Sequence, residues 1–190
     1  AKDKSIIAYW NFEEGQGTAT VNDASGNENT GSINGTVTGA NWVTGKFGKA
    51  YDFNGTDEFI KTPGLNFIGN STSAFTVSGW INPRVTAGTI FHNYYPSASW
   101  STGLVGFYGG KLSYNIYSLG FVIETGTTPI NSWTYVSFTR DSFGNNKLYK
   151  NGVLVASNNG TYSASGGANE IGIGRYRNDC CQFDSPGWFN

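Results

Sequence analysis

Short runs in which apolar and polar residues alternate, separated by Gly, Asn and Pro, constrain the fold of this chain more than any other feature. The alternation is clear in Phe75–Ile81 and Trp133–Arg140, and it has the period of a half-buried strand. No stretch shows the period of an amphipathic helix. The pattern therefore predicts an all-β protein, an antiparallel sandwich of two sheets with about a dozen strands.

Turn signals divide the chain into the expected strands. Asn-Gly and Gly-Gly pairs supply the positive φ angles of tight hairpins. We expect hairpins across residues 54–57, 109–110 and 151–152. They would join 50–53 to 58–61, 104–108 to 111–117, and 147–150 to 153–156. Further strands are predicted over Ile6–Phe12, Phe75–Ile81, Thr89–His92, Phe121–Glu124, Trp133–Arg140 and Ile171–Ile173, with a long loop over residues 15–39.

Two tryptophans are expected to belong to the core. Trp10 shares one face of the first predicted strand with Ile6, Ala8 and Phe12. Trp80 lies on the face of its strand opposite Val77 and Ile81, and we still expect its loss to damage folding. His92 is predicted to be a half-buried strand residue.

Length and charge narrow the classes of protein to which the chain could belong. At 190 residues it is predicted to form one domain, residues 1–190. The net charge is −1 and no basic cluster is present, so nucleic acid is not expected as a partner. No apolar run approaches the length of a membrane span, so membrane insertion is not expected either. The Asn-, Ser- and Thr-rich composition and the absence of Met favour an extracellular protein, secreted or at the cell surface, whose export signal has been removed.

The two cysteines, Cys180 and Cys181, are adjacent. They could form a vicinal disulfide, remain free thiols or bridge to other chains. In an exported protein the vicinal disulfide is favoured. A metal site is disfavoured here because the single histidine lies far away in the sequence.

An ordered series of motifs covers nearly the whole chain. It resembles the laminin G-like, concanavalin A-like jelly-roll domains of prokaryotic surface and secreted proteins. The matching stretches are Ala8–Gly15, Asp23–Asn27 with Asn29 and Gly31, Gly45–Gly55, Phe75–Asn82, Trp133–Val136, Leu148–Gly152 and Ile171–Arg175.

This resemblance implies a jelly roll of two facing antiparallel sheets. Members of the family normally end in a further strand that pairs beside the first one, and the sequence stops before that strand. We therefore expect the edge of Ile6–Phe12 to be open to strand addition by a neighbouring subunit.

The segment from Asp23 to Asn29 is rich in the oxygen ligands that calcium prefers. The resemblance implies a structural calcium ion near this loop. Its predicted ligands are Glu13 (or Glu14), Asp23, Asn27 and Asn29. The alternative is an Asx turn that hydrogen-bonds only within the protein.

The carboxylates do not form a hydrolytic arrangement in the sequence. Relatives that cleave glycans carry clustered acids on one strand, in a Glu-x-Asp-x-x-Glu pattern that is absent here. Glu13 and Glu14 are neighbours and point to opposite faces, while Glu124 and Glu170 are isolated. We therefore expect no enzymatic activity, and a glycoside hydrolase or lyase is the least favoured hypothesis.

Two segments combine aromatic rings with hydrogen-bonding side chains, as sugar sites do. They predict a non-catalytic extracellular binding module, carbohydrate-binding or adhesive, whose partner is a glycan or surface polysaccharide. The alternative is a structural subunit of an extracellular filament or appendage, assembled by strand exchange. The predicted ligand-binding residues are Tyr94, Tyr95, Trp100, Arg175, Tyr176, Arg177, Asp179 and Trp188.

Overall fold

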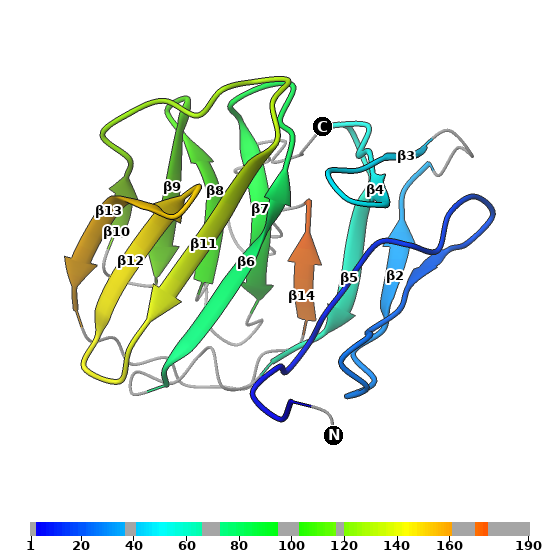
Figure 1. Ribbon diagram of the computed structural model, residues 1–190, viewed down its shortest axis with the longest axis horizontal. Coiled ribbons are helices and arrows are strands. Elements are labelled where there is room, and N and C mark those ends of the chain that lie inside the picture. Colours follow the sequence, from blue (N-terminus) through cyan, green and yellow to red (C-terminus); the bar gives the residue numbers. More distant parts are fainter. Residues whose placement is uncertain are drawn as a thin grey trace.

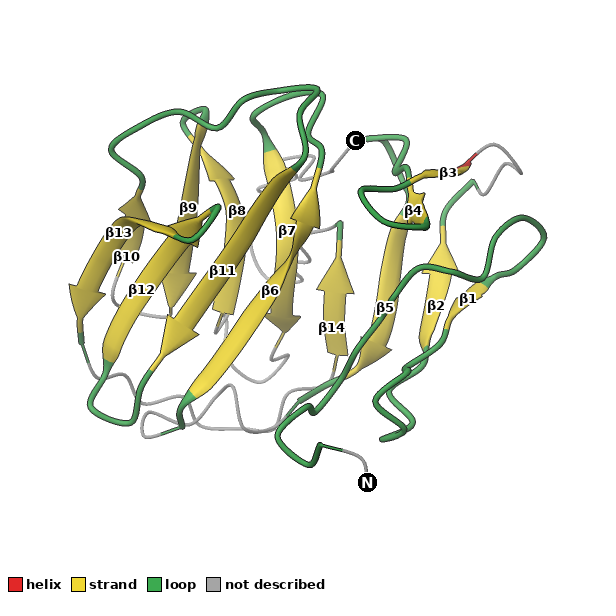
Figure 2. Cartoon of the chain, in the orientation of Figure 1, coloured by secondary structure: helices red, strands yellow, loops and turns green. Residues whose placement is uncertain are grey.

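The computed structural model describes residues 3–36, 41–65, 73–94, 103–116, 120–160 and 170–174. These residues are nearly all in strands and the turns between them (Figure 2). None of them forms a helix with the length and hydropathy needed to cross a membrane. The strands are β1 (Thr20–Val21), β2 (Gly31–Asn34), β3 (Trp42–Thr44), β4 (Lys49–Tyr51), β5 (Phe59–Pro63), β6 (Phe75–Ile81), β7 (Gly88–Tyr94), β8 (Gly103–Tyr108), β9 (Lys111–Ile116), β10 (Gly120–Ile123), β11 (Thr134–Arg140), β12 (Asn145–Lys150), β13 (Val153–Asn159) and β14 (Glu170–Ile173).

The strands form a sandwich of unequal layers. The large sheet has eight strands in the order β1-β2-β5-β14-β7-β8-β9-β10, and the small sheet has four in the order β13-β12-β11-β6. All pairs are antiparallel, and β3 and β4 form a separate hairpin. In Figure 1 the small sheet lies in front of β7 to β10, whereas the N-terminal segment and the β3–β4 hairpin lie in front of β5 and β2. The predicted all-β sandwich is confirmed.

The space between the two sheets holds the first hydrophobic cluster. Phe138 of β11 is 3% exposed, and its ring packs against Tyr114 of β9 at 4.6 Å and Phe75 of β6 at 5.7 Å between centroids. Every second residue of β11 points into this cluster, as the alternation predicts. Its buried members are Ile81, Phe91, Val105, Leu112, Tyr114, Val136, Phe138, Leu148 and Ile171.

A second hydrophobic cluster lies where the small sheet does not cover the large one. Tyr51 and Phe53, at and just after the end of the β3–β4 hairpin, pack their rings 5.0 Å apart and cover Ile33 and Ile60 of the large sheet. Trp10 contacts both clusters, so the core is continuous and the expected burial of Trp10 is partly met: its ring is half-buried. The N-terminal segment and the hairpin thus complete the layer that four strands leave unfinished.

Predictions from local turn chemistry are confirmed for two hairpins and wrong for one. β8 pairs with β9, and β12 pairs with β13 across Asn151 and Gly152, whose φ angles are 49° and 82°. The turn at 54–57 also forms, but its flanking strands do not pair with each other. β4 pairs with β3, and β5 enters the large sheet between β2 and β14. This turn therefore carries the chain from one layer to the other.

Two predictions for the N-terminal third are wrong. Ile6–Phe12 forms no strand in the structure and makes a single bridge, from Trp10 to Asp23. The predicted loop over 15–39 contains β1 and β2, and β2 lies between β1 and β5 in the large sheet. The strand expected at Ile6–Phe12 is absent because side chains of the 23–29 turn, described below, take the hydrogen-bonding places of a neighbouring strand.

Trp80 lies on the outer face of the small sheet, so its expected core role is wrong. The side chain is 39% exposed, whereas Ile81 and Phe138 are buried between the sheets. The strand period explains the difference, because Val77 and Ile81 occupy the inward positions of β6 and leave the outward position to Trp80.

We expect Phe138→Ala to lower the free energy of unfolding by about 3–5 kcal/mol, since it empties a buried site that the surrounding sheets cannot close. Trp80→Ala should cost about 1 kcal/mol, the value of exposed aromatic contacts. Urea denaturation of both variants measures the two effects. Equal costs would contradict the outward placement of Trp80.

Candidate functional site

Most of the ligand-binding residues predicted from the sequence lie outside the described residues. Tyr94 ends β7, where its backbone pairs with Glu170, and its side chain is outside the description. For these residues, binding stays a prediction, as does the vicinal disulfide. The predicted residues beyond the described ranges are Tyr95, Trp100, Arg175, Tyr176, Arg177, Asp179, Cys180, Cys181 and Trp188.

The described surface carries an aromatic cluster that the sequence analysis did not identify as a site. Trp80 of β6 and Tyr135 of β11 are direct cross-strand neighbours with ring centroids 5.3 Å apart. Phe47, which is 73% exposed, packs edge-on against Trp80 at 5.9 Å. The ammonium group of Lys46 lies 5.1 Å from the centroid of the Trp80 ring. We call Lys46, Phe47, Trp80 and Tyr135 the Trp80 platform.

The β3–β4 hairpin brings Lys46 and Phe47 to the small sheet. Its tip is closed by a hydrogen bond from the Gly45 amide to the Gly48 carbonyl, 2.9 Å long. Gly48 has a φ of 60°, and a Cβ atom there would collide with the Glu13 carboxylate. A glycine is therefore required at this turn, and Figure 1 shows the hairpin tip beside the end of β6.

Hydroxyl groups continue the outer face of the small sheet beyond the Trp80 platform. Ser78 pairs directly with Ser137, and Thr76 pairs with Thr139. These four positions have the same parity as Trp80 and Tyr135, so they face the same side of the sheet. Together they form a polar surface next to the aromatic rings.

A second aromatic pair lies on the large sheet. Tyr108 and Phe121 are stacked, with ring centroids 4.1 Å apart and planes inclined by 14°. They are 52% and 41% exposed. Because each ring covers one face of the other, this pair offers a ligand less flat surface than its total area suggests.

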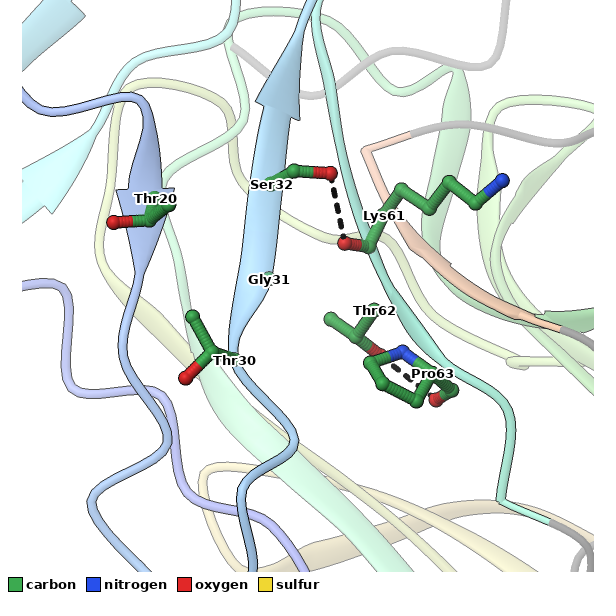
Figure 3. Close-up of a pocket in the computed structure, with 7 residues that line it drawn as sticks. All are labelled: Thr20, Thr30, Gly31, Ser32, Lys61, Thr62 and Pro63. Atoms are coloured by element: carbon green, nitrogen blue, oxygen red, sulfur yellow. Dashed lines mark hydrogen bonds between the residues drawn. The ribbon is translucent and has the colours of Figure 1, made fainter.

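A shallow, open pocket of about 350 Å³ lies beside β1, β2 and β5 (Figure 3). The Lys61 ammonium, which comes from β5, forms an ion pair with Glu170 at 2.7 Å. No aromatic ring lines this pocket, so it lacks the flat apolar face that a sugar ring stacks on. Its lining residues are Thr20, Thr30, Gly31, Ser32, Lys61, Thr62 and Pro63.

Asp23 organises the predicted calcium loop through hydrogen bonds within the protein. Its Oδ1 accepts from the backbone amides of Tyr9 and Ser25, both at 2.9 Å. Its Oδ2 accepts from the backbone and side-chain amides of Asn29, both at 3.0 Å. Partial burial alone would raise the pKa of Asp23, but the hydrogen bonds from Ser25, Tyr9 and Asn29 outweigh it and hold the pKa well below its ordinary value.

The asparagines of this turn bind the N-terminal segment. The side-chain amide of Asn27 donates to the carbonyls of Ile6 and Ile7 at 2.9 and 3.0 Å, and that of Asn29 donates to Ile7 at 2.8 Å. These contacts replace the ladder hydrogen bonds of the predicted first strand.

As arranged here, the four predicted calcium ligands do not fit the ion. Four N–H groups occupy the Asp23 carboxylate, and they point at the positions where a cation would bind. The Glu13 carboxylate lies against the β3–β4 hairpin, where it accepts from the Lys49 amide at 3.1 Å. Among the described residues, no three acidic, histidine or cysteine side chains gather at one point. The geometry supports the Asx turn, and calcium stays a prediction.

Three buried carboxylates are each held by their own partners. Glu58 accepts from the Asn41 side chain and the Asn54 amide, and burial raises its pKa. Glu124 would also have a raised pKa through burial, but hydrogen bonds from Lys150 and neighbouring groups lower it. Glu170 pairs with Lys61, as described above. Distributed in this way, these three groups do not form the facing pair that glycoside hydrolysis requires.

His92 is fully buried at 1% exposure and not half-buried as predicted. It lies in the middle of β7, between β14 and β8. Burial lowers the pKa of His92 to about 3, so the imidazole is neutral at physiological pH.

We expect Asp23→Asn to destabilise the protein at pH 7 by about 1–3 kcal/mol, the value of hydrogen bonds to a charged group. Because the folded-state pKa is lowered, the carboxylate contributes fully above about pH 4, the pKa of an unfolded aspartate. The contribution is lost as the pH falls through the folded-state pKa. Urea denaturation between pH 7 and pH 2 should therefore show the two proteins converging in acid.

Asp3→Asn is the matched control, because the exposed Asp3 carboxylate accepts hydrogen bonds from Ser5 alone among the described residues. Adding EDTA at neutral pH distinguishes the two interpretations of this segment, a hydrogen-bonded turn and a calcium site. An unchanged Tm supports the hydrogen-bonded turn, and a fall in Tm supports bound calcium.

The fold is similar to those of several solved domains. Domain 4 of AbnA, an extracellular GH43 arabinanase from Geobacillus stearothermophilus solved with arabinotriose, is 22% identical with a TM-score of 0.66, over 96% of this chain and 87% of that one. The binding domain of Paraclostridial Mosquitocidal Protein 1 is 18% identical with a TM-score of 0.63, over 87% and 44% of the two chains. The receptor-binding domain of botulinum neurotoxin C/D mosaic serotype is 17% identical with a TM-score of 0.65, over 92% and 44%.

This chain thus spans less than half of either toxin chain, and at these identities the likeness shows a shared fold. No curated protein has a significantly similar sequence. The laminin G-like family model of the concanavalin A-like lectin/glucanases superfamily matches residues 54–185, well over half of the chain. This protein therefore belongs to the concanavalin A-like lectin/glucanases superfamily.

Proposed function

We propose that this chain is a non-catalytic carbohydrate-binding module of an extracellular protein, and that the Trp80 platform contacts the sugar. The observation that carries the proposal is the set of three rings on the outer face of the small sheet. Phe47 and Trp80 remain exposed although they are large and apolar. The planes of Phe47 and Tyr135 are inclined to that of Trp80 by 77° and 55°, so a sugar would stack its C–H side on the face of one ring at a time.

The surroundings of the platform suit a sugar better than a purely apolar ligand. Ser78 and Ser137 lie directly beyond Trp80 and Tyr135 on the same face. Their hydroxyl groups both donate and accept hydrogen bonds, as the hydroxyl groups of a sugar require. The β-sheet also holds Trp80 and Tyr135 in place before a ligand arrives, which lowers the entropy lost on binding.

The structural comparisons support a binding role in general. The arabinanase domain was solved with arabinotriose, and the toxin domains are named as binding or receptor-binding domains. All three are parts of larger proteins, and the arabinanase is described as extracellular. The kind of sugar bound by this chain has to be argued from its own residues.

A second candidate function is that of a structural subunit assembled by strand addition. It is favoured by β6, which is seven residues long and has a strand neighbour on one side only among the described residues. Long open edges accept strands from other chains. Light scattering across a range of protein concentrations tests this candidate. Oligomers that grow with concentration support it, and a monomer at all concentrations contradicts it.

We expect the intact chain to bind at least one polysaccharide in a panel of arabinan, xylan, β-glucan and polygalacturonate, measured by affinity electrophoresis and calorimetry. Trp80→Ala should weaken that binding more than tenfold, because burying a large aromatic ring contributes about 1.5–3 kcal/mol. The variant should remain folded, since Trp80 lies outside the core.

Two variants serve as controls. Phe143→Ala removes an 80% exposed ring at the turn between β11 and β12, and binding should be unchanged. Tyr108→Ala tests the stacked pair on the large sheet. If Tyr108→Ala abolishes binding and Trp80→Ala does not, the sugar site lies on the large sheet.

A further inference from the structure

Among the residues that the structure describes, Lys46 is the one cation that lies over an aromatic ring of the platform. Its ammonium group lies over the Trp80 ring, and it belongs to none of the three ion pairs among the described residues. A cation–π contact at an exposed site is weak. It keeps the ammonium group near the ring, and the group retains its positive charge and can still pair with an anion. A sugar that stacks on this face of Trp80 would displace the ammonium group to the edge of the ring, where it meets the edge of the sugar.

The small sheet carries no acidic residue. The strands β6, β11, β12 and β13 contain lysine and arginine but neither aspartate nor glutamate. Arg140 is buried and Lys150 is engaged by Glu124, so Lys147 is the cation of the sheet's outer face. This face is thus positive on a chain whose net charge is −1.

Two carboxylates outside the sheet, those of Asp141 and Glu13, are held in place by hydrogen bonds from amide groups. Asp141, which follows β11, accepts from the amide of Phe143 and from the backbone and side chain of Asn145. Glu13 accepts from the Lys49 amide behind the hairpin tip. Neither carboxylate lies within ion-pair distance of Lys46 or Lys147. Hydrogen bonds from Asn145, and to a smaller extent the positive charge of Lys147, lower the pKa of Asp141.

The two lysines lie at opposite ends of the polar surface. Lys147 pairs with Thr139, which is four residues along β11 from Tyr135. Four residues of a strand span about 13 Å. Over that distance the outer face presents Ser78, Ser137 and Thr76, so the surface between the lysines offers hydroxyl groups to an extended chain of sugars.

We propose that the outer face of the small sheet binds a polysaccharide that carries uronic acid residues, with Lys46 pairing with a sugar carboxylate beside the Trp80 ring and Lys147 with a second one further along. This inference rests on the proposed function, because it assigns the class of sugar to the same site. Aromatic rings without an adjacent cation would suit a neutral glycan equally well. The two lysines, on and beside strands that carry no acidic side chain, favour the acidic glycan.

The test compares two polymers with the same backbone: polygalacturonate and its fully methyl-esterified form, which has lost its charge. We expect wild type to bind polygalacturonate at least tenfold more tightly. Lys46→Gln should remove about tenfold of that affinity, the value of a hydrogen bond to a charged group, and leave the methyl ester unaffected. Lys147→Gln should have a smaller effect in the same direction.

Lys111→Gln is the matched control, because Lys111 is a cation of the large sheet that is also outside the three ion pairs. Its binding should equal that of wild type. Dextran sulfate reports on general attraction to polyanions. If dextran sulfate binds as tightly as polygalacturonate and still binds to Trp80→Ala, the inference is overturned.

The results separate the two proposals. If Trp80→Ala loses both polymers but the wild type binds them equally, the proposed function stands and the preference for uronic acid is wrong. If Trp80→Ala binds like wild type, or if neither polymer is bound, the platform does not bind this class of sugar. Both proposals are then wrong for that class.

Discussion

Covering the inner face of the large sheet is the constraint on which the rest of this structure depends. Eight strands present more apolar surface than four strands can cover, and an exposed remainder would cost folding free energy in proportion to its area. The N-terminal segment and the β3–β4 hairpin cover it, with Tyr51 and Phe53 packed on Ile60. The hairpin tip that results places Lys46 and Phe47 beside Trp80, so the candidate site is a consequence of how the core is closed.

Polar side chains hold the covering segments in place where no strand pairing does. Asp23 and Asn29 bind the N-terminal segment, and Glu58 joins Asn41 to the turn after β4. Hydrogen-bond donors around these carboxylates compensate for the water that they lose on folding. A charged group can be buried only when it has such partners. These residue types also occur in metal and catalytic sites, but the structure uses them to fix loops.

The outer face of the small sheet is the opposite case, because its aromatic side chains remain partly exposed and contact one another instead of the core. Aromatic, hydroxyl and cationic groups follow one another from Trp80 to Lys147 on a rigid sheet. The inner positions of the same strands stabilise the fold, so the outward ones can serve a ligand. This division explains how one strand, β6, contributes Ile81 to the core and Trp80 to the proposed sugar surface.

The sequence by itself determined the all-β class, most strand positions and the tight hairpins, because alternation and Asn-Gly or Gly-Gly turns act over a few residues. It also showed that Trp80 faces away from Val77 and Ile81. Only the tertiary structure decided which strands pair: β4 with β3 instead of β5, and Ile6–Phe12 with a turn instead of a strand. It alone brought Phe47 to Trp80, which lies 33 positions further along the chain, because that contact depends on how the layers close over the core and not on any local pattern.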